Sequence, residues 1–529
     1  MISPDNPQQI DVYDFVLPFS GHLDPHNQWV QLAHRMPWTA LSAEYAQCFS
    51  ADHGRPALAA RIAIGAVIIQ QMKGLTDEET VQEIRENPYV QYFLGYPDYC
   101  YRQCFDPSLL VTIRRRIGPD LIAQFTRQFL AAQDAPSTEA SAGDSPPDTP
   151  EPDADTGTGS AQPPAALPES PPSPDAVADP AASDASADPQ GQLLLDATVA
   201  PADIRYPTDL DLLNRCREIS EALIDTLWEP GAGRVKPRTY RQVARREYLA
   251  VAKKRKKSGK QVRKAVRKQL QYVKRNLGHI DRLLEAMPDR AIPVSRADYR
   301  HMLVIREVYR QQQTMYEHRT HRMPGRIVSV SQPHVRPIVR GKAGATTEFG
   351  AKLSVSLVDG LAYLDRIRWD AFNESQDLPA QVEGFRERFG HYPAVVIADG
   401  IYGTRVNRQY LQERGIRFSG KPLGRPPADA QQRKAAGKRR KQEATQRNRI
   451  EGKFGEGKRK YQLDCVRTKR QDTSEHWIAM TFFVMNIAAV LRRYFLARIF
   501  WALRWWFAGR IALVFCVTRN QQQERGLFQ

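Results

Sequence analysis

The chain has 529 residues, a formal net charge of +17 at pH 7 and six scattered cysteines. This length suffices for more than one domain and for a sizeable core. The excess of basic residues favours a polyanionic partner, most simply nucleic acid. The few cysteines argue against a disulfide-rich secreted scaffold, and the polar N-terminus lacks a signal-peptide pattern, so we expect a cytoplasmic protein.

Residues 1–27 predict an irregular lead, and residues 28–131 predict a helical N-terminal domain. Within it, residues 57–72 are apolar with helical periodicity, and Gly74 follows them. Thr76-Asp-Glu-Glu is a capping box, which predicts the start of a second helix. The outline fits a helix-turn-helix that binds DNA ends, but a plain helical hairpin gives the same outline, so both remain open.

The composition changes over residues 132–191, which are rich in Pro, Ala, Ser and Asp. Residues 133–191 hold twelve acidic residues and no Lys or Arg. Low hydrophobicity and charge of one sign predict a disordered linker. We interpret it as a passive tether, although it could also compete with DNA for the basic surface elsewhere in the chain.

Two short apolar runs each end in an aspartate. Residues 193–195 lead to Asp196, and residues 394–398 lead to Asp399. Both runs predict buried strands with the acid at the carboxyl end. Active-site residues of open α/β sheets gather at that edge, so we expect the two acids to lie close together.

A third acid, Glu451, belongs to a predicted helix. Arg447, Glu451, Phe454 and Lys458 recur at spacings of four, three and four, which puts them on one helical face. For this stretch alone, an exposed helix with i,i+4 ion pairs is an equally simple interpretation. Together with the two aspartates, however, Glu451 completes an oxygen-only set of the kind that Mg²⁺ or Mn²⁺ prefers. Two such ions can bind the attacking and leaving oxygens of a phosphodiester.

The motifs Leu-Asp196-Ala-Thr, Ala-Asp399-Gly-Ile-Tyr402 and Arg447-x3-Glu451-x6-Lys458 occur in this order. With them the sequence resembles the DDE transposases of bacterial insertion sequences over most of residues 20–130 and 190–495. The resemblance implies that Asp196, Asp399 and Glu451 are the catalytic and metal-binding residues, with two Mg²⁺ (or Mn²⁺) ions. Many members carry a Tyr three residues before the Arg, where this chain has Ala444.

The resemblance further implies double-stranded DNA as partner, both the element ends and the target. It implies a homodimer or larger assembly on DNA, in the bacterial cytoplasm and associated with the nucleoid when bound. The expected reaction is metal-dependent hydrolysis at the element ends followed by strand transfer. Two alternatives stay open: a structure-selective nuclease that cuts without joining, and a non-catalytic basic nucleic-acid-binding protein.

The expected fold is mixed α/β. Residues 192–495 predict a catalytic domain that the resemblance makes RNase H-like, with a mixed sheet interrupted by a helical insertion over residues 208–322. Sheet patterning resumes over 326–339, and residues 349–369 predict a hairpin. Residues 378–389 and 405–414 predict helices between the later strands.

Basic segments are the candidate DNA contacts, although charge runs are often only solvated surface. Charges recur around most of the helix expected at 245–275, which argues against a buried helix. Residues 420–442, rich in Gly, Pro, Lys and Arg, predict a mobile loop that orders on DNA. The candidate phosphate contacts are Lys253, Lys254, Arg255, Arg263, Lys264, Lys438, Arg439, Arg440, Arg447, Lys458, Arg459 and Lys460.

The C-terminal region is apolar. Residues 477–491 form an uninterrupted run, which predicts the last core helix packed on the sheet. No stretch reaches the ~18 uncharged apolar residues of a membrane helix, so we expect no stable membrane span. Residues 496–529 predict an amphipathic tail of aromatic and basic residues, for oligomerisation or for a surface.

Overall fold

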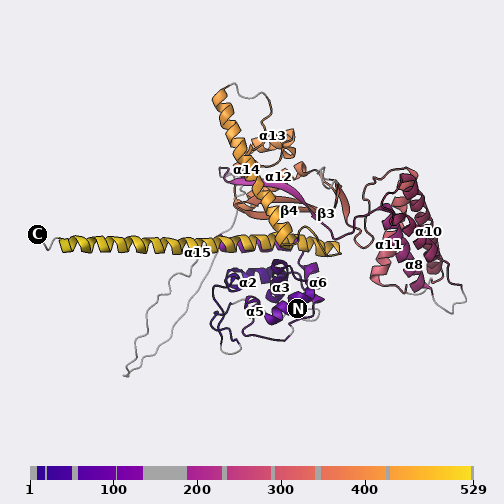
Figure 1. The fold of residues 1–529 in the computed structure, drawn as a ribbon, viewed down its shortest axis with the longest axis horizontal. Helices are drawn as coiled ribbons and strands as arrows, with labels where there is room; N and C mark the ends of the chain where they lie inside the picture. Colours follow the sequence, from indigo (N-terminus) through magenta and orange to yellow (C-terminus); the bar gives the residue numbers. More distant parts are fainter. Residues whose placement is uncertain are drawn as a thin grey trace, which may run out of the picture.

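The computed structural model describes residues 9–17, 21–50, 57–102, 104–134, 188–228, 235–287, 292–339, 347–424 and 429–525, with side chains as far as Arg498. The fold is mixed α/β, as the sequence predicts. Figure 1 shows the N-terminal helices on one side of the long C-terminal helix and the sheet on the other. The linker prediction falls largely on residues 135–187, outside the described residues.

The N-terminal helices pack around one central helix. They are α1 (Gln28–Arg35), α2 (Trp38–Ala46), α3 (Ala60–Lys73), α4 (Asp77–Glu86), α5 (Pro88–Phe93), α6 (Leu109–Arg116) and α7 (Pro119–Asp134). Nearly all of α3 is buried, and it ends at Gly74, whose φ of 69° is left-handed. The predicted capping box is confirmed, because the side chains of Thr76 and Glu79 each accept a hydrogen bond from the other's backbone N–H.

The central sheet contains the strands β1 (Gln192–Pro201), β2 (Arg336–Val339), β3 (Thr347–Val358), β4 (Leu361–Arg368), β5 (Val395–Ile397) and β6 (Arg417–Phe418). Its order is β2-β3-β1-β5-β6, with β4 also paired to β3. β3 runs antiparallel to β1, β2 and β4, whereas β5 runs parallel to β1 and β6. The predicted hairpin is thus confirmed as β3 and β4.

Alternation along β1 assigns its two faces to different cores. Leu193 and Leu195 pack with α12 (Leu378–Phe389) and α13 (Arg405–Glu413), which match the predicted helices. Leu194 faces the opposite core, with side chains from the two C-terminal helices α14 (Ala430–Lys460) and α15 (Gln471–Arg525). Two short 3-10 helices, η2 (Glu374–Asp377) and η3 (Gly400–Tyr402), follow β4 and β5.

The predicted resumption of the sheet at 326–339 is correct only for β2. The apolar and polar residues that alternate before β2 do not form a strand. Their apolar side chains pack in two different cores. Ile327 and Val330 pack in the core of the insertion, whereas Val328 and Val335 pack in the core beneath the sheet.

The insertion forms a helical bundle of α8 (Asp209–Leu227), α9 (Arg241–Ala252), α10 (Gly259–Glu285) and α11 (Arg296–Glu317), set to one side of the sheet (Figure 1). As the charge pattern predicted, its basic helix α10 is not buried on all sides, but it has one apolar face. Val266, Leu270, Val273, Leu277 and Ile280 recur at helical spacing along α10 and enter the bundle core.

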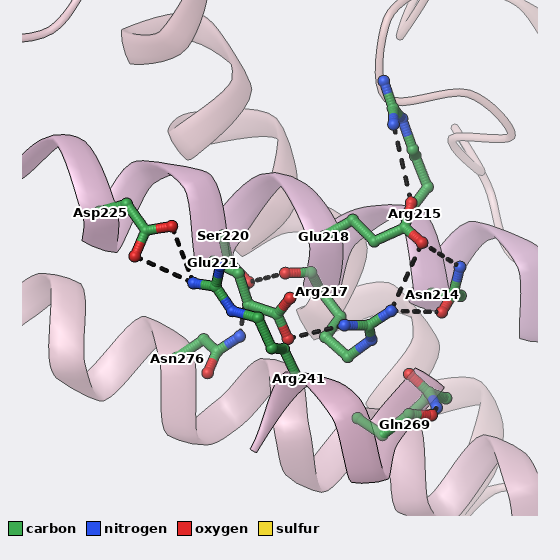
Figure 2. A network of polar contacts seen from close by, with 11 residues as sticks. Asn214, Arg215, Arg217, Glu218, Ser220, Glu221, Asp225, Arg241, Gln269 and Asn276 are labelled. Carbon is green, nitrogen blue, oxygen red and sulfur yellow. Dashed lines mark hydrogen bonds and ion pairs between the residues drawn. The ribbon is translucent and has the colours of Figure 1, made fainter. Parts of the chain in front are cut away.

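A buried polar network also joins the helices of the bundle (Figure 2). Arg217 of α8 is 2% exposed and donates to Glu221 Oε1 at 2.7 Å and to Asn214 Oδ1 at 2.8 Å. Asn276 of α10 donates to Ser220 Oγ at 2.9 Å, which links α10 to α8.

The prediction of a basic loop over 420–442 is wrong from Ala430 onward, where α14 begins. Asp429 caps it, because its side chain accepts from the Gln431 N–H at 2.9 Å. The segment that follows is rich in Ala, Gln, Lys and Arg and lacks Pro, so its helix propensity is high despite its charge.

The predicted last core helix is confirmed as the first part of α15, which has two partners. Trp477 and Phe482 pack in the core beneath the sheet, whereas Met480 and Phe483 pack among the N-terminal helices. Residues 471–498 form a helix long and apolar enough to cross a membrane, but 67% of its most apolar 18-residue stretch is buried inside the protein. The tail's backbone continues the helix to Arg525, while its side chains after Arg498 lie outside the described part.

Candidate active site

The strands that lead to the first two candidate acids, β1 and β5, are neighbours in the sheet. The last paired residues of these parallel strands are Leu194 and Ile397. Asp196 lies two residues beyond Leu194, still within β1, whereas Asp399 lies two residues beyond Ile397, after the end of β5 and at the start of η3. Asp196 is not at the end of its strand, as the sequence predicted, because β1 continues to Pro201 in its pairing with β3.

Both aspartates are oriented by backbone N–H groups. Asp196 Oδ1 accepts from the Ala197 N–H at 2.8 Å, and Asp399 Oδ1 accepts from the Gly400 N–H at 2.6 Å at the start of η3. Asp196 is half-buried, whereas Asp399 is exposed. The pair therefore has one carboxylate inside the sheet edge and one open to solvent.

The helix α14 brings the third acid to Asp196 through an arginine. Arg447 Nη2 lies 3.0 Å from Glu451 Oε1, and Arg447 Nη1 lies 3.9 Å from Asp196 Oδ2. Ile450 and Phe454 are buried in the core beneath the sheet, so the helical face that carries Arg447 and Glu451 is held against β1. The predicted i,i+4 ion pair is confirmed, and the same arginine lies near Asp196.

Asp196 lies in an environment that opposes its ionisation. Burial raises the pKa of its carboxyl group to about 6, and the carboxylates of Glu374 and Glu451 contribute to the rise. Hydrogen bonding by Ala197 and the charge of Arg447 act in the opposite direction. Even with Arg447 beside it, an ionised Asp196 is therefore short of positive charge.

Sequence reasoning missed Glu374, the first residue of η2. Its carboxylate pairs with Lys352 Nζ of β3 at 2.8 Å and raises the pKa of Asp196. No motif or spacing relates Glu374 to the other three acids, because only the packing of η2 against the sheet edge brings it there. Tyr402 is fully buried in the core with α12 and α13, and burial together with the charges of Glu374 and Asp196 raises the pKa of its hydroxyl.

A divalent cation fits the donor chemistry of this site. Its acids offer hard carboxylate oxygens, and Asp196 lacks compensating positive charge. Within the part of the chain that the structure describes, no group of three or more His, Cys, Asp or Glu side chains is positioned to hold a metal ion. Arg447 lies between two of the acids instead.

The candidate phosphate contacts fall into two separate groups. On α14, Lys438, Arg439 and Arg440 are exposed on the half that extends from the sheet (Figure 1), and Arg459 and Lys460 are exposed at its C-terminal end, whereas Lys458 is half-buried. In the insertion, Lys253, Lys254, Arg255 and Lys264 are exposed. Arg263 instead stacks on the ring of Tyr316 at 4.0 Å, which indicates a packing role.

Two family models match the chain. One is described as "Transposase DDE domain" and matches residues 396–488, which include Asp399 and Glu451. The other is described as "Transposase domain (DUF772)" and matches residues 18–116, which include α1 to α6.

A curated protein of Rhizobium meliloti, described as "Uncharacterized protein ORF8 in nfe locus", is 31% identical over 110 residues. The match covers 21% of this chain and 53% of that protein, so the chain spans about half the length of this relative. No solved structure matches the chain.

Proposed function

The two transposase-domain matches support an insertion-sequence DDE transposase, and from that premise we propose that the chain catalyses DNA transposition. In this proposal the protein hydrolyses a phosphodiester at each end of its element and then joins the freed 3′-hydroxyl to target DNA. It works in the cytoplasm as a homodimer or larger assembly on double-stranded DNA.

The observation that carries this proposal is that Arg447 lies between Asp196 of β1 and Glu451 of α14. The strand that leads to Asp399, β5, is paired to β1, which supports the inclusion of Asp399 in the same site. The strand order supports an RNase H-like catalytic domain, because three antiparallel strands (β4, β3, β1) continue into two parallel ones (β5, β6).

The DDE transposase family normally uses divalent metal ions, and we assign two Mg²⁺ or Mn²⁺ ions to Asp196, Asp399 and Glu451. When bound, such ions would lower the pKa of water and stabilise the charge on the phosphate oxygens. Asp196 would hold its ion from the buried side of the site and Asp399 from the open side.

Basic residues would hold the DNA. Arg447 stands beside two of the acids and would contact phosphates next to the scissile bond. The exposed cations of α14 and of the insertion, together with the half-buried Lys458, would bind the duplex further away. We assign these outer contacts to Lys253, Lys254, Arg255, Lys264, Lys438, Arg439, Arg440, Lys458, Arg459 and Lys460, and leave Arg263 a packing role.

A strand-transfer assay tests the proposal. Purified full-length protein is incubated with DNA fragments that carry the ends flanking its gene, a target plasmid and Mg²⁺ or EDTA. Asp399→Asn is compared with Asp359→Asn, a matched control in the exposed β3–β4 turn, where the left-handed backbone suits asparagine.

We expect Mg²⁺-dependent joining by the wild type and by Asp359→Asn. Asp399→Asn should lower the joining activity by more than the roughly 10–100-fold that is typical when a residue that only contacts a metal ligand is changed. Its DNA binding should stay nearly intact. Cleavage without joining would indicate the nuclease alternative. Full activity of Asp399→Asn would contradict the assignment of the acids.

A further inference from the structure

Two helices from opposite parts of the chain meet at their C-terminal ends. The helices α1 to α7 are called the N-terminal unit. Its helix α3 ends at Gly74, and the candidate catalytic helix α14 ends at Tyr461, which is followed by Gln462. The last carbonyl groups of a helix have no partner within the helix. Both ends close with a residue in the left-handed conformation, Gly74 with φ 69° and Gln462 with φ 57°.

Each helix end supplies a glutamine that caps the other. Gln71 of α3 donates through Nε2 to Tyr461 O and to Thr481 Oγ1, both at 2.9 Å. Gln462 donates through Nε2 to Gly74 O at 2.9 Å. Because Gln71 is 2% exposed, its two hydrogen bonds are sheltered from water. A carbonyl at the end of each helix is thus satisfied by the other helix.

The residue types at the two left-handed positions fit this exchange. A Cβ at Gly74 would lie 2.5 Å from Gln462 Nε2 and would displace that amide, while the left-handed backbone favours glycine in its own right. Glycine would also suit the conformation at position 462, yet a glutamine stands there. Its amide, which reaches Gly74, supplies a physical reason for that choice.

The exposed face of α4 argues against DNA reading by this N-terminal unit. Its first turn holds Asp77, Glu78 and Glu79, and Glu78 and Glu79 are exposed. Exposed carboxylates repel phosphates, so this face suits a helical hairpin better than a recognition helix. The part of the hairpin that contacts the end of α14 is its turn, at Gln71 and Gly74.

We propose that the N-terminal unit is a positioning device for α14, in which Gln71 and Gln462 set how far α14 is shifted along its axis and how it is rotated about it. Glu451 lies about 16 Å before Gln462 along the helix, so a rotation at this end moves Glu451 and Arg447 relative to Asp196. The catalytic consequence rests on the proposed function, whereas the docking itself does not.

The experiment compares three substitutions at position 462 with the wild type. Gln462→Ala removes the amide and keeps the backbone constraint, whereas Gln462→Gly removes the amide and suits the left-handed conformation. If Gln462 only ends the helix, glycine should serve as well as glutamine. Gln462→Asn also suits the conformation but is one methylene shorter, and Gln82→Ala on the exposed face of α4 is the matched control.

Two readouts are measured for each variant. Amide hydrogen exchange over residues 447–460 reports the order of α14, and Mg²⁺-dependent cleavage at saturating DNA reports kcat. We expect all three substitutions at position 462 to speed exchange and to lower kcat by about tenfold or more, with Kd for DNA unchanged. Gln82→Ala should match the wild type in both readouts.

Wild-type exchange and kcat in Gln462→Gly would overturn the proposal, and that variant also retains the helix end should the alanine variant fail to fold. If the wild type shows no cleavage at all, the proposed function fails. Hydrogen exchange would still decide whether the two glutamines hold α14.

Discussion

At the residue scale, Asp196 makes the candidate site sensitive to pH. Its folded-state pKa of about 6 lies above the ordinary value of 3.8, chiefly because the carboxyl group is buried. The unfolded chain therefore ionises first, and the folded state loses stability as the pH rises from about 4 to 6. We expect Asp196→Asn to be more stable than the wild type at pH 7 by about 1–3 kcal/mol, with the difference shrinking toward pH 4.

Urea unfolding at several pH values, with and without Mg²⁺, measures this effect. A bound cation should favour the ionised carboxylate, so Mg²⁺ should stabilise the wild type more than Asp196→Asn, and more at pH 7 than at pH 5. Equal stability of the two proteins at every pH would contradict the account of Asp196.

His476 should make the fold sensitive to acid. It is buried where α15 contacts the N-terminal helices, and its Nδ1 lies 2.6 Å from Ile117 O. Burial lowers its pKa to about 4, so only the unfolded chain gains a proton as the pH falls below about 6.5. Stability is thus intact above pH 6.5 and falls by up to about 3 kcal/mol toward pH 4.

His476→Gln removes the titrating group and keeps an amide that can donate to Ile117 O. We expect its melting temperature to fall less between pH 7.5 and pH 5 than that of the wild type. His334, whose pKa burial also lowers to about 4, remains in both proteins and leaves a residual acid loss. An identical pH profile in the two proteins would rule out titration of His476.

At the element scale, the insertion depends on charges buried between its helices. Arg217→Ala leaves Glu221 buried without its partner at 2.7 Å, and we expect a loss of about 3–5 kcal/mol in unfolding free energy. The double variant Arg217→Met with Glu221→Leu should lose much less, because no buried charge remains. Arg215→Ala is the control, since that side chain is 65% exposed.

Chemical denaturation of these variants provides the measurement. A single and a double variant of equal stability would indicate that the two charges are not coupled. Figure 2 shows why they should be, since Glu221 and Asn214 both point at the Arg217 guanidinium.

Elements with a strong local signal could be predicted from the sequence. The capping box at Thr76, the hairpin of β3 and β4, and helix α12 follow from local patterns and agree with the structure. The start of α14 could not be predicted in this way, because its composition is also that of a basic loop. The buried face of α10 was hidden because charged residues alternate with its apolar ones along the sequence.

The candidate site was only partly predictable, because local patterns reveal only some of its residues. The three acids belong to short local motifs, so they could be proposed from the sequence. Glu374 belongs to no motif, and Gln71 contacts a residue 390 positions away in the chain. Such contacts depend on tertiary packing, which local periodicity does not contain.

At the scale of the whole molecule, the basic surface of the insertion is expected to set how tightly the protein holds DNA. Lys253, Lys254 and Arg255 are exposed in the turn between α9 and α10. Changing all three to Gln should weaken binding to any duplex and reduce the log–log salt slope by about 0.9 for each phosphate that the protein no longer neutralises.

Fluorescence anisotropy over a range of salt concentrations measures that slope. Arg85, Arg102 and Arg127, exposed on the N-terminal unit and changed to Gln together, serve as the control. If the control lowers the slope and the insertion variant does not, the N-terminal unit would be the part that binds DNA. That result would reverse the roles assigned to the two units.

The central claim is that Asp196, Asp399 and Glu451 hold divalent ions together, and Fe²⁺-directed cleavage of the chain tests it most directly. Fe²⁺ takes the place of Mg²⁺, and peroxide with ascorbate then generates radicals that cut the backbone beside the bound ion. We expect cuts near residues 196, 399 and 451 that excess Mg²⁺ suppresses and Asp399→Asn abolishes. Cuts confined to other segments, or unchanged in Asp399→Asn, would contradict the claim.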